Sequence, residues 1–257
     1  MKLVLSGGGT RGVLIHAGFV QALLDAGVRI DALAGTSAGA LVAYATAVGA
    51  SPAEVALDAL APTRGAKPLA RRGLYAHRGY PYLYPSGGVL RLLRALERPF
   101  VTRSLVVYTS NLSTRREHVW RSYEHPHAPW PWVVLASMSI PFVFQPIRIF
   151  GQDHVDGGLT SNFALDAFGD DPSTRGVYID GGPKTPSNPL GVRAYVGAIV
   201  SLAINANVRE DIEDADAART LRIPATGASL SFDYGRAEAL RLIDHGRAAA
   251  LASGWIR

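Results

Sequence analysis

The pentapeptide Gly35-Thr36-Ser37-Ala38-Gly39 constrains this chain most, because of the segments on either side of it. Residues 30–34 are typical of a short buried strand, and residues 38–49 of a small apolar helix. A Gly-x-Ser-x-Gly sequence between a strand and a helix is the form of a nucleophile elbow, which exposes a serine hydroxyl at a helix N-terminus. Gly35 and Gly39 lack the Cβ atoms that would collide in so tight a turn. A strand–helix turn without chemistry would have the same form, and the pentapeptide alone leaves both readings open.

A second glycine-rich turn precedes this elbow. Residues 3–5 indicate a strand, the loop Ser6–Gly12 follows, and a helix with apolar residues at helical spacing closes at Gly27. The glycines match Gly-x-Gly-x-x-Gly, a fingerprint of dinucleotide binding, and Asp31 lies near the spacing of its ribose-binding acid. Asp31 precedes the next strand, however, whereas a ribose-binding acid belongs at that strand's carboxyl end. Dinucleotide binding also leaves the elbow serine unexplained.

The same loop can instead serve an ester-cleaving site. Backbone N–H groups at a helix N-terminus attract negative charge, whether on a phosphate or on a transient oxyanion. In this interpretation the N–H groups of Gly8 and Gly9 face the carbonyl oxygen of an ester. Arg11 would brace the loop or add positive charge; the alternative is an exposed arginine in the first turn of the helix.

The rest of the chain alternates between strands and helices, which favours an α/β fold with a largely parallel sheet. Ser51-Pro52-Ala53-Glu54 is a capping box that predicts a helix as far as Leu60. Residues 62–88 are typical of a long loop or cap. The other expected helices cover residues 88–97, 132–140, 190–205, 211–220 and 236–252; the other expected strands cover residues 105–108, 117–120, 147–150 and 176–179, with residues 153–158 a turn or strand edge.

Length and composition bound the class of protein. The 257 residues suffice for one large domain or two small ones, and no repeat or linker divides them. The absence of cysteine excludes disulfides, thiolate metal sites and a cysteine nucleophile. Met1-Lys2 leads directly into the first strand, so no secretory signal fits, and no apolar run is long enough to span a bilayer. We therefore expect a cytoplasmic protein, although export without a cleaved signal stays open.

A serine hydroxyl needs a base to become a nucleophile. None of the seven histidines lies in a recognisable triad context. His154 is the best candidate among them, because it lies two residues from Asp156 and can share its face of a strand. Asp156 itself precedes two glycines, and an Asp-Gly-Gly turn is a weak signal when taken alone.

Taken together, three ordered motifs resemble those of patatin-like lipid acyl hydrolases: Ser6–Gly12, Gly35–Gly39 and Asp156-Gly157-Gly158. Two weaker blocks agree, one at residues 136–146 and one in the C-terminal region at residues 230–233 and 242–246. The resemblance covers nearly the whole chain. It implies a three-layer α/β/α patatin-like fold with a central, mostly parallel sheet, in a single domain over residues 1–257 with a cap at roughly 62–100.

The resemblance also implies a Ser–Asp dyad in place of a triad, with Ser37 as the nucleophile and Asp156 as the general base. A carboxylate in a partly desolvated pocket is a stronger base than in water. The matching oxyanion positions are Gly7, Gly8, Gly9, Arg11 and Gly12, and the elbow glycines are Gly35 and Gly39. Neither a metal nor an organic cofactor is implied. Ser6 departs from many plant members, which have aspartate before the glycines.

Positive charge and aromatic residues gather in one stretch of the chain. Residues 64–103 hold nine basic residues and a single acid, Glu97, interleaved with Tyr75, Tyr80, Tyr82 and Tyr84. This composition suits an anionic membrane surface, and the alternative is a solvated cap whose tyrosines pack locally. Trp130-Pro131-Trp132 is a second candidate for a lipid-contacting edge or, alternatively, a packed helix start. No motif for nucleic-acid recognition is present.

The sequence thus predicts an enzyme that cleaves acyl esters of phospholipids or lysophospholipids and makes peripheral contact with an anionic membrane. Within enzymes, the alternatives are a general carboxylesterase, a thioesterase or an acyltransferase with the same dyad. Outside enzymes, the alternative is a non-catalytic lipid- or nucleotide-binding module. The sequence does not specify the head group, the acyl length or the oligomeric state.

Overall fold

Strands and helices alternate along most of the chain, as the sequence predicts. The computed structural model describes residues 1–60, 75–181, 195, 198–204, 218–225 and 234–256. The strands are β1 (Lys2–Leu5), β2 (Ala32–Thr36), β3 (Tyr75–His77), β4 (Tyr80–Tyr82), β5 (Ser104–Asn111), β6 (Arg116–Arg121), β7 (Ile147–Ile149), β8 (Gln152–Asp156), β9 (Thr174–Asp180) and β10 (Thr220–Pro224). The helices are α1 (Gly9–Asp25), α2 (Ala38–Ala47), α3 (Pro52–Leu60), α4 (Gly87–Ala95), α5 (Trp130–Ser137) and α8 (Arg236–Ala252), with the short 3-10 helices η1 (Gly157–Leu159) and η2 (Leu165–Phe168).

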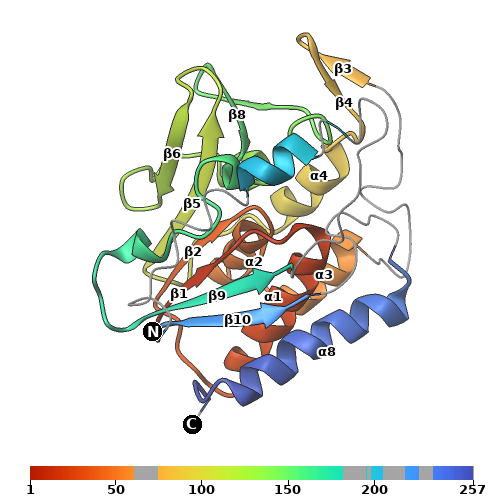
Figure 1. The fold of residues 1–257 in the computed structure, drawn as a ribbon. Helices are drawn as coiled ribbons and strands as arrows, with labels where there is room; N and C mark the ends of the chain where they lie inside the picture. The colour runs from red at the N-terminus through yellow and green to blue at the C-terminus, as the bar shows by residue number, and fades with distance from the viewer. Residues whose placement is uncertain (61–74, 182–194, 196–197, 205–217, 226–233, 257) are drawn as a thin grey trace.

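One eight-stranded sheet forms the centre of the fold (Figure 1). Its main order is β10-β9-β1-β2-β5-β8-β7, and β6 pairs with β5 from the other edge. The five strands from β10 to β5 are parallel. β6 and β8 run antiparallel to β5, and β7 runs antiparallel to β8. The predicted α/β fold class with a mostly parallel sheet is therefore confirmed.

Both faces of this sheet are covered, which explains why its central strands are apolar on both sides. Leu3, Leu5 and Leu33 face a large core shared with α1, α2, α3, α5 and α8. The alternate residue Val4 faces a second, smaller core that includes Phe163 from the segment between η1 and η2. Side chains that alternate along a strand in this way give three layers: helices, sheet, and the shorter segment of residues 157–168.

α8 lies against α1 although the two helices are far apart in sequence (Figure 1). Glycines make their close approach possible. A Cβ atom on Gly18 would collide with the backbone carbonyl of Ile243, and one on Gly246 would collide with that of Ile15. Each helix thus presents a glycine to the backbone of the other, and α8 fixes the position of α1 over the sheet.

The structure shifts two predicted boundaries near the glycine-rich turns. The second strand covers Ala32–Thr36 rather than residues 30–34, because its register is set by pairing with β1 and β5 and it runs directly into Ser37. α1 begins at Gly9, so half of the predicted glycine loop is its first turn. Glycine's weak helix propensity favoured a loop there, but a first turn needs few internal hydrogen bonds.

Other boundaries differ for identifiable reasons. The helix expected at residues 132–140 is α5 and begins at Trp130, because Pro131 is tolerated in a first turn. β10 was not predicted: this edge strand contains Arg222 and Pro224, and four of its five residues are at least partly exposed. The expected helix 211–220 lies mostly outside the described residues, and its last residue begins β10. Of the expected helix 190–205, the described residues 195 and 198–204 are helical.

The predicted cap is described from Tyr75 onward. A small hairpin of β3 and β4 stands apart from the central sheet (Figure 1), with the rings of Tyr75 and Tyr82 stacked at a centroid distance of 5.4 Å. α4 follows at Gly87–Ala95, as expected, and buries Val89 and Leu93 against the core. Residues 61–74, which carry four of the nine basic side chains, lie outside the described part.

Candidate active site

Ser37 occupies a strained turn between β2 and α2. Its φ of 53° and ψ of −115° fall where residues other than glycine are rarely found. The two elbow glycines are required by space: a Cβ on Gly35 would lie 2.5 Å from the Gly39 carbonyl carbon, and one on Gly39 would collide with the backbone of Leu5 and Ser6. The turn therefore places the Ser37 side chain at the N-terminus of α2.

A hydrogen-bond chain holds the backbone of this turn. The Ser37 N–H donates to Ser137 Oγ at 2.9 Å, and Ser137 Oγ donates to the Tyr108 carbonyl at 2.6 Å. Ser137 is fully buried at the end of α5. It thus links the elbow to the neighbouring strand β5. The role of Ser137 was not predicted, because its local sequence does not show that Ser37 and Tyr108 are its neighbours in the fold.

The strand β5 brings Asp156 to Ser37. On one edge, β5 pairs first with β2, up to the pair Tyr108 and Thr36. β8 then takes over the same edge in the antiparallel direction, beginning with the pair Thr109 and Asp156. The last residue of β8 therefore lies next to the residue that follows β2. The Ser37 Oγ donates a hydrogen bond to Asp156 Oδ2 at 2.7 Å.

Asp156 is buried, with 1% of its surface exposed. Burial raises the pKa of its carboxyl group to about 7, and the hydrogen bonds from Ser37 and Gly158 oppose part of this rise. The Gly158 N–H donates to Oδ1 at 2.8 Å, so each carboxylate oxygen has one donor. A carboxylate with this pKa is basic enough to accept a proton from a hydroxyl near neutral pH.

The glycine turn lies beside Ser37, and not all of its N–H groups are available. The Gly7 N–H donates to the Asn162 carbonyl at 3.0 Å, and the Gly12 N–H donates to the Gly8 carbonyl at 3.2 Å. The N–H groups of Gly7 and Gly12 are therefore already paired in this structure, and the oxyanion role of the turn stays a prediction. Gly8 and Gly9 precede the first internal hydrogen bond of α1, and their N–H groups are unpaired among the described residues.

A further donor lies at the start of α2 and was missed. The first N–H groups of α2 to be paired internally are those of Ala40 and Leu41, both to the Ser37 carbonyl. The Ala38 N–H precedes them, directly after Ser37, where serine hydrolases with an elbow draw one oxyanion donor. The signal for Ala38 was present in the sequence, since the residue after an elbow serine begins the helix.

The positions of Arg11 and Asp31 in the structure exclude two interpretations that the sequence left open. Arg11 is 7% exposed, so it is not an exposed first-turn arginine; burial lowers its pKa, and the nearby Tyr234 partly opposes this change. Asp31 precedes β2 and pairs with Arg29 at 2.9 Å. It therefore lies at the amino ends of the parallel strands, whereas the glycine turn follows the carboxyl end of β1. It therefore cannot hold a ribose bound at that turn.

His154 does not contact Ser37 in the way a base would. Its Nδ1 lies 3.0 Å from Thr109 Oγ1, and its ring packs against Trp120 and His118. Burial, with a smaller contribution from His118, lowers the pKa of His154 to about 4, so the ring is neutral at physiological pH. The hydroxyl of Ser37 is paired with Asp156 instead.

An apolar cavity of about 40 Å³ opens beside Ser37. Residues from several helices and from the loop after α5 form its walls, among them Val13, Leu41, Leu60, Val89, Met138 and Phe144. Ser37, Ala38 and Gly9 also line it. Because hydrocarbon is the chemistry that such walls favour, the cavity suits the first carbons of an acyl chain.

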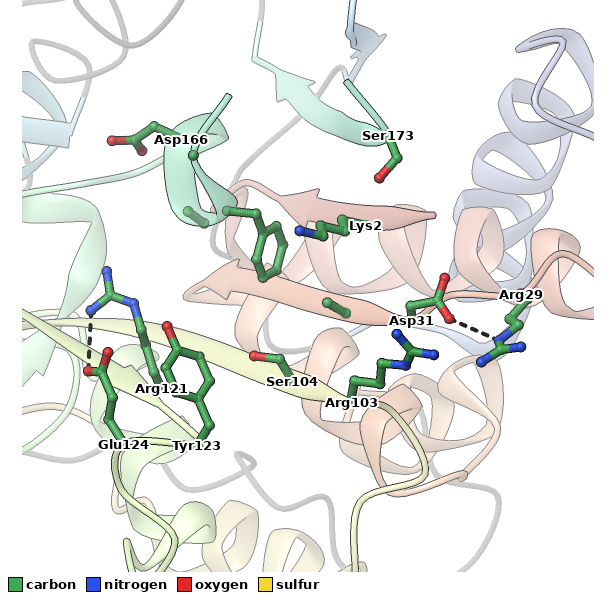
Figure 2. A pocket seen from close by; sticks show the side chains of 14 residues that line it. Lys2, Arg29, Asp31, Arg103, Ser104, Arg121, Tyr123, Glu124, Asp166 and Ser173 are labelled. Atoms are coloured by element: carbon green, nitrogen blue, oxygen red, sulfur yellow. Dashed lines mark ion pairs between the residues drawn. The ribbon is translucent and has the colours of Figure 1, made fainter. Parts of the chain in front are cut away.

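A much larger cavity, of about 1020 Å³, lies at the amino ends of the parallel strands (Figure 2). It is lined by residues that begin β1, β2 and β5, including Lys2 and Ser104, whereas Ser37 follows the carboxyl end of β2. Ion pairs of the protein itself occupy its walls: Figure 2 shows Arg29 with Asp31 and Arg121 with Glu124. Neither Ser37 nor Asp156 lines this cavity, and ligands of open α/β sheets bind at the carboxyl ends of the strands.

Two observations concern cofactors and membranes. Among the described residues, no group of three or more histidine, aspartate or glutamate side chains could hold a metal ion. In the same part of the chain, no helix combines the length and the apolar character needed to cross a bilayer.

Fold and site together define an α/β protein built around a strained elbow serine that is hydrogen-bonded to a buried aspartate. Comparison with known proteins agrees with this class. The model of the patatin-like phospholipase family matches residues 3–168, and the chain therefore belongs to this family. The resemblance found in the sequence is thus confirmed.

Individual relatives are distant. An uncharacterized NTE family protein of Mycobacterium tuberculosis is 28% identical over 195 residues, which cover 70% of this chain and 30% of the relative. A protein of the same description from Mycobacterium bovis matches equally. The chain thus matches under a third of the length of these relatives. Among solved structures, VipD from Legionella pneumophila has the same fold, with a TM-score of 0.62 and 15% identity over 98% of this chain and 66% of that chain.

Proposed function

We propose that this protein is a lipid acyl hydrolase that cleaves carboxylic ester bonds of phospholipids or lysophospholipids through a Ser37–Asp156 dyad. The observation that carries the proposal is the 2.7 Å hydrogen bond from the Ser37 hydroxyl to a buried carboxylate. Family membership and the apolar cavity beside Ser37 support an acyl ester as the substrate.

In the first step, Ser37 Oγ attacks the ester carbonyl while Asp156 Oδ2 takes the hydroxyl proton. The N–H groups of Gly8, Gly9 and Ala38 stabilise the oxyanion that forms. Loss of one such donor typically lowers turnover by about 10²–10³-fold. When the tetrahedral intermediate collapses, the carbon–oxygen bond to the alcohol breaks, and Asp156 returns the proton to the leaving alkoxide.

In the second step, a water molecule attacks the acyl-serine ester. Asp156 takes a proton from the water, the acyl–Oγ bond breaks, and the proton passes to Ser37 Oγ. The fatty acid leaves and the free enzyme is restored. No group outside the protein and the water is needed for either step.

A fluorophosphonate probe tests the nucleophile. We expect one covalent adduct, located on Ser37 by mass spectrometry and absent from Ser37→Ala. A lipid panel then identifies the substrate by the fatty acid released, with Ser37→Ala as the control. Folded wild-type protein that neither reacts with the probe nor releases fatty acid would favour a non-catalytic lipid- or nucleotide-binding module. Turnover of thioesters or soluble esters without turnover of phospholipids would favour a thioesterase or a general carboxylesterase.

Paired variants test the base. Asp156→Asn should lower turnover by several orders of magnitude, because Ser37 then lacks a proton acceptor. His154→Ala should retain most of the activity, since His154 pairs with Thr109 rather than with Ser37. The reverse result would contradict the dyad.

We also propose peripheral contact with an anionic membrane, supported by the basic and tyrosine-rich composition of residues 64–103. Co-sedimentation with vesicles of anionic phospholipid should weaken with added salt and with reversal of charge at Arg71 and Arg72. Binding that ignores both changes would argue against this contact.

A further inference from the structure

Asn162 lies beside both members of the Ser37–Asp156 pair. A Cβ atom placed on Gly158 would lie 3.0 Å from Asn162 Oδ1 and 3.1 Å from Asp156 Oδ1, so the amide and the carboxylate flank the same Cα atom. A Cβ atom on Gly7 would collide with the Asn162 amide and would lie 3.7 Å from Ser37 Cβ. The side chain of Asn162 therefore borders the space next to the nucleophile and the carboxylate.

The backbone around Asn162 is fixed by two hydrogen bonds from the site itself. The Thr36 Oγ1 donates to the Ser161 carbonyl at 2.9 Å, and the Gly7 N–H donates to the Asn162 carbonyl at 3.0 Å. Thr36 immediately precedes the elbow serine, and Gly7 belongs to the glycine turn. Asn162 is thus held at a defined position relative to both turns.

The side chain of Asn162, by contrast, is not used by the protein. Only 7% of the residue is exposed, and its amide forms no hydrogen bond with any described residue. The amide atoms are not among the sealed side-chain atoms that lack a partner, so a small polar molecule can reach them. A water molecule binds in such a place when it finds two to four polar groups around it. Asn162 and Asp156 provide two of them.

Building on the function proposed above, we propose that the Asn162 amide binds the water molecule that hydrolyses the acyl-serine. The amide and Asp156 hold this water between them. Its oxygen forms the new bond to the acyl carbon, and its proton passes to Asp156. The bond from the acyl carbon to Ser37 Oγ then breaks, and Asp156 delivers the proton to Oγ. Formation of the acyl-serine uses no water, so Asn162 acts in the second step alone.

Pre-steady-state kinetics with p-nitrophenyl butyrate separate the two steps. Release of p-nitrophenol reports acylation in the first turnover and deacylation thereafter. For Asn162→Leu, which keeps the volume but cannot hydrogen-bond, we expect a burst of about one p-nitrophenol per Ser37. The rate of this burst should lie within about threefold of the wild-type burst rate. The steady-state turnover that follows should be at least tenfold slower than that of the wild type. Asn162→Ser, whose hydroxyl can still bind water, should recover part of the steady-state rate.

A neighbouring variant and a folding measurement serve as controls. Ser161→Ala alters an equally buried residue of the same segment and should leave both phases unchanged. Thermal unfolding shows which variants are folded. If Asn162→Leu does not fold, the test rests on Asn162→Ser, for which we expect a smaller loss of rate that is confined to the steady state. Equal loss in both phases, or loss in neither, would overturn the role of Asn162. A wild type without Ser37-dependent p-nitrophenol release would instead overturn the proposed function, and this role with it.

Discussion

Replacement of Asp156 by asparagine should have opposite effects on activity and on stability. The variant loses the proton acceptor for Ser37, and turnover falls by orders of magnitude. It should nevertheless be more stable than the wild type at neutral and alkaline pH. The reason is that the wild type has to hold a buried carboxylate in its charged form, whereas the amide of asparagine is neutral at every pH.

The magnitude follows from the shift in pKa. The carboxyl of Asp156 changes from 3.8 to about 7 on folding, chiefly because it is buried. At about 1.4 kcal/mol per pKa unit, ionisation of this one group opposes folding by about 4 kcal/mol. Between pH 4 and pH 7 the folded state keeps a proton that the unfolded chain releases. The free energy of unfolding therefore falls as pH rises through this range, and the full penalty is present above pH 7.

Urea unfolding at pH 5 and at pH 8 measures this effect. The informative quantity is the stability of Asp156→Asn minus that of the wild type at each pH. Other titrating groups cancel in this difference, including His16 and His154, whose pKa values are lowered to about 4 by burial. We expect the difference to grow by about 2–3 kcal/mol from pH 5 to pH 8, because part of the ionisation penalty is already present at pH 5 and any cost of imperfect hydrogen bonding by the amide is the same at both pH values.

A difference that does not change with pH would refute the reasoning, because it would mean that Asp156 ionises as easily in the folded protein as in the unfolded chain. A variant that is less stable than the wild type at pH 8 would refute it as well. In that case the hydrogen bonds to Ser37 and Gly158 would outweigh the cost of burial.

Three further outcomes are expected. The kcat/KM of the wild type for a soluble ester should fall about tenfold per pH unit below pH 7 and level off above it, because Asp156 must be ionised; a flat profile from pH 5 to pH 8 would contradict this. Gly39→Ala should destabilise the fold by about 3 kcal/mol or more in urea unfolding, because its Cβ meets β1 backbone, whereas Gly87→Ala points into open space and should be tolerated. Ser137→Ala should cost about 1–3 kcal/mol and reduce the rate of fluorophosphonate labelling, while Thr46→Ala, which removes a buried hydroxyl bonded within α2, should leave that rate unchanged.

Local sequence predicted the parts of the site that are built locally. The small residues around Ser37 predict a tight strand–helix turn, and the structure shows the collisions that other residues would cause there. The glycine turn before α1 was located correctly, and the Gly8 and Gly9 N–H groups expected to face the ester are unpaired among the described residues, but the pairing of the Gly7 and Gly12 N–H groups was not foreseen. Which N–H groups are free depends on partners such as the Asn162 carbonyl, which lies 155 positions away from Gly7 in the numbering.

The pairing of Ser37 with Asp156 needed more than local pattern. It depends on two strands that share one edge of β5, and no periodicity within either strand specifies this register. The order of family motifs supplied it instead. The two-residue spacing from Asp156 favoured His154 over the other histidines, yet the His154 ring is paired with Thr109. β10 was not predicted because an edge strand can form with few apolar residues, so its sequence lacks the usual pattern of a buried strand.

The contact between α1 and α8, in which a glycine of each helix meets the backbone of the other, bears on the choice of recombinant fragments of this protein. The match to the family model ends at residue 168, yet the helix that begins with Gly9 rests on Ile243 and Gly246. A recombinant fragment trimmed to the matched segment would keep Ser37 and Asp156. It would also lose β9, whose Ile179 packs against Gly8, and would leave the apolar flank of α1 bare. The limits of sequence similarity are therefore not the limits of the folding unit.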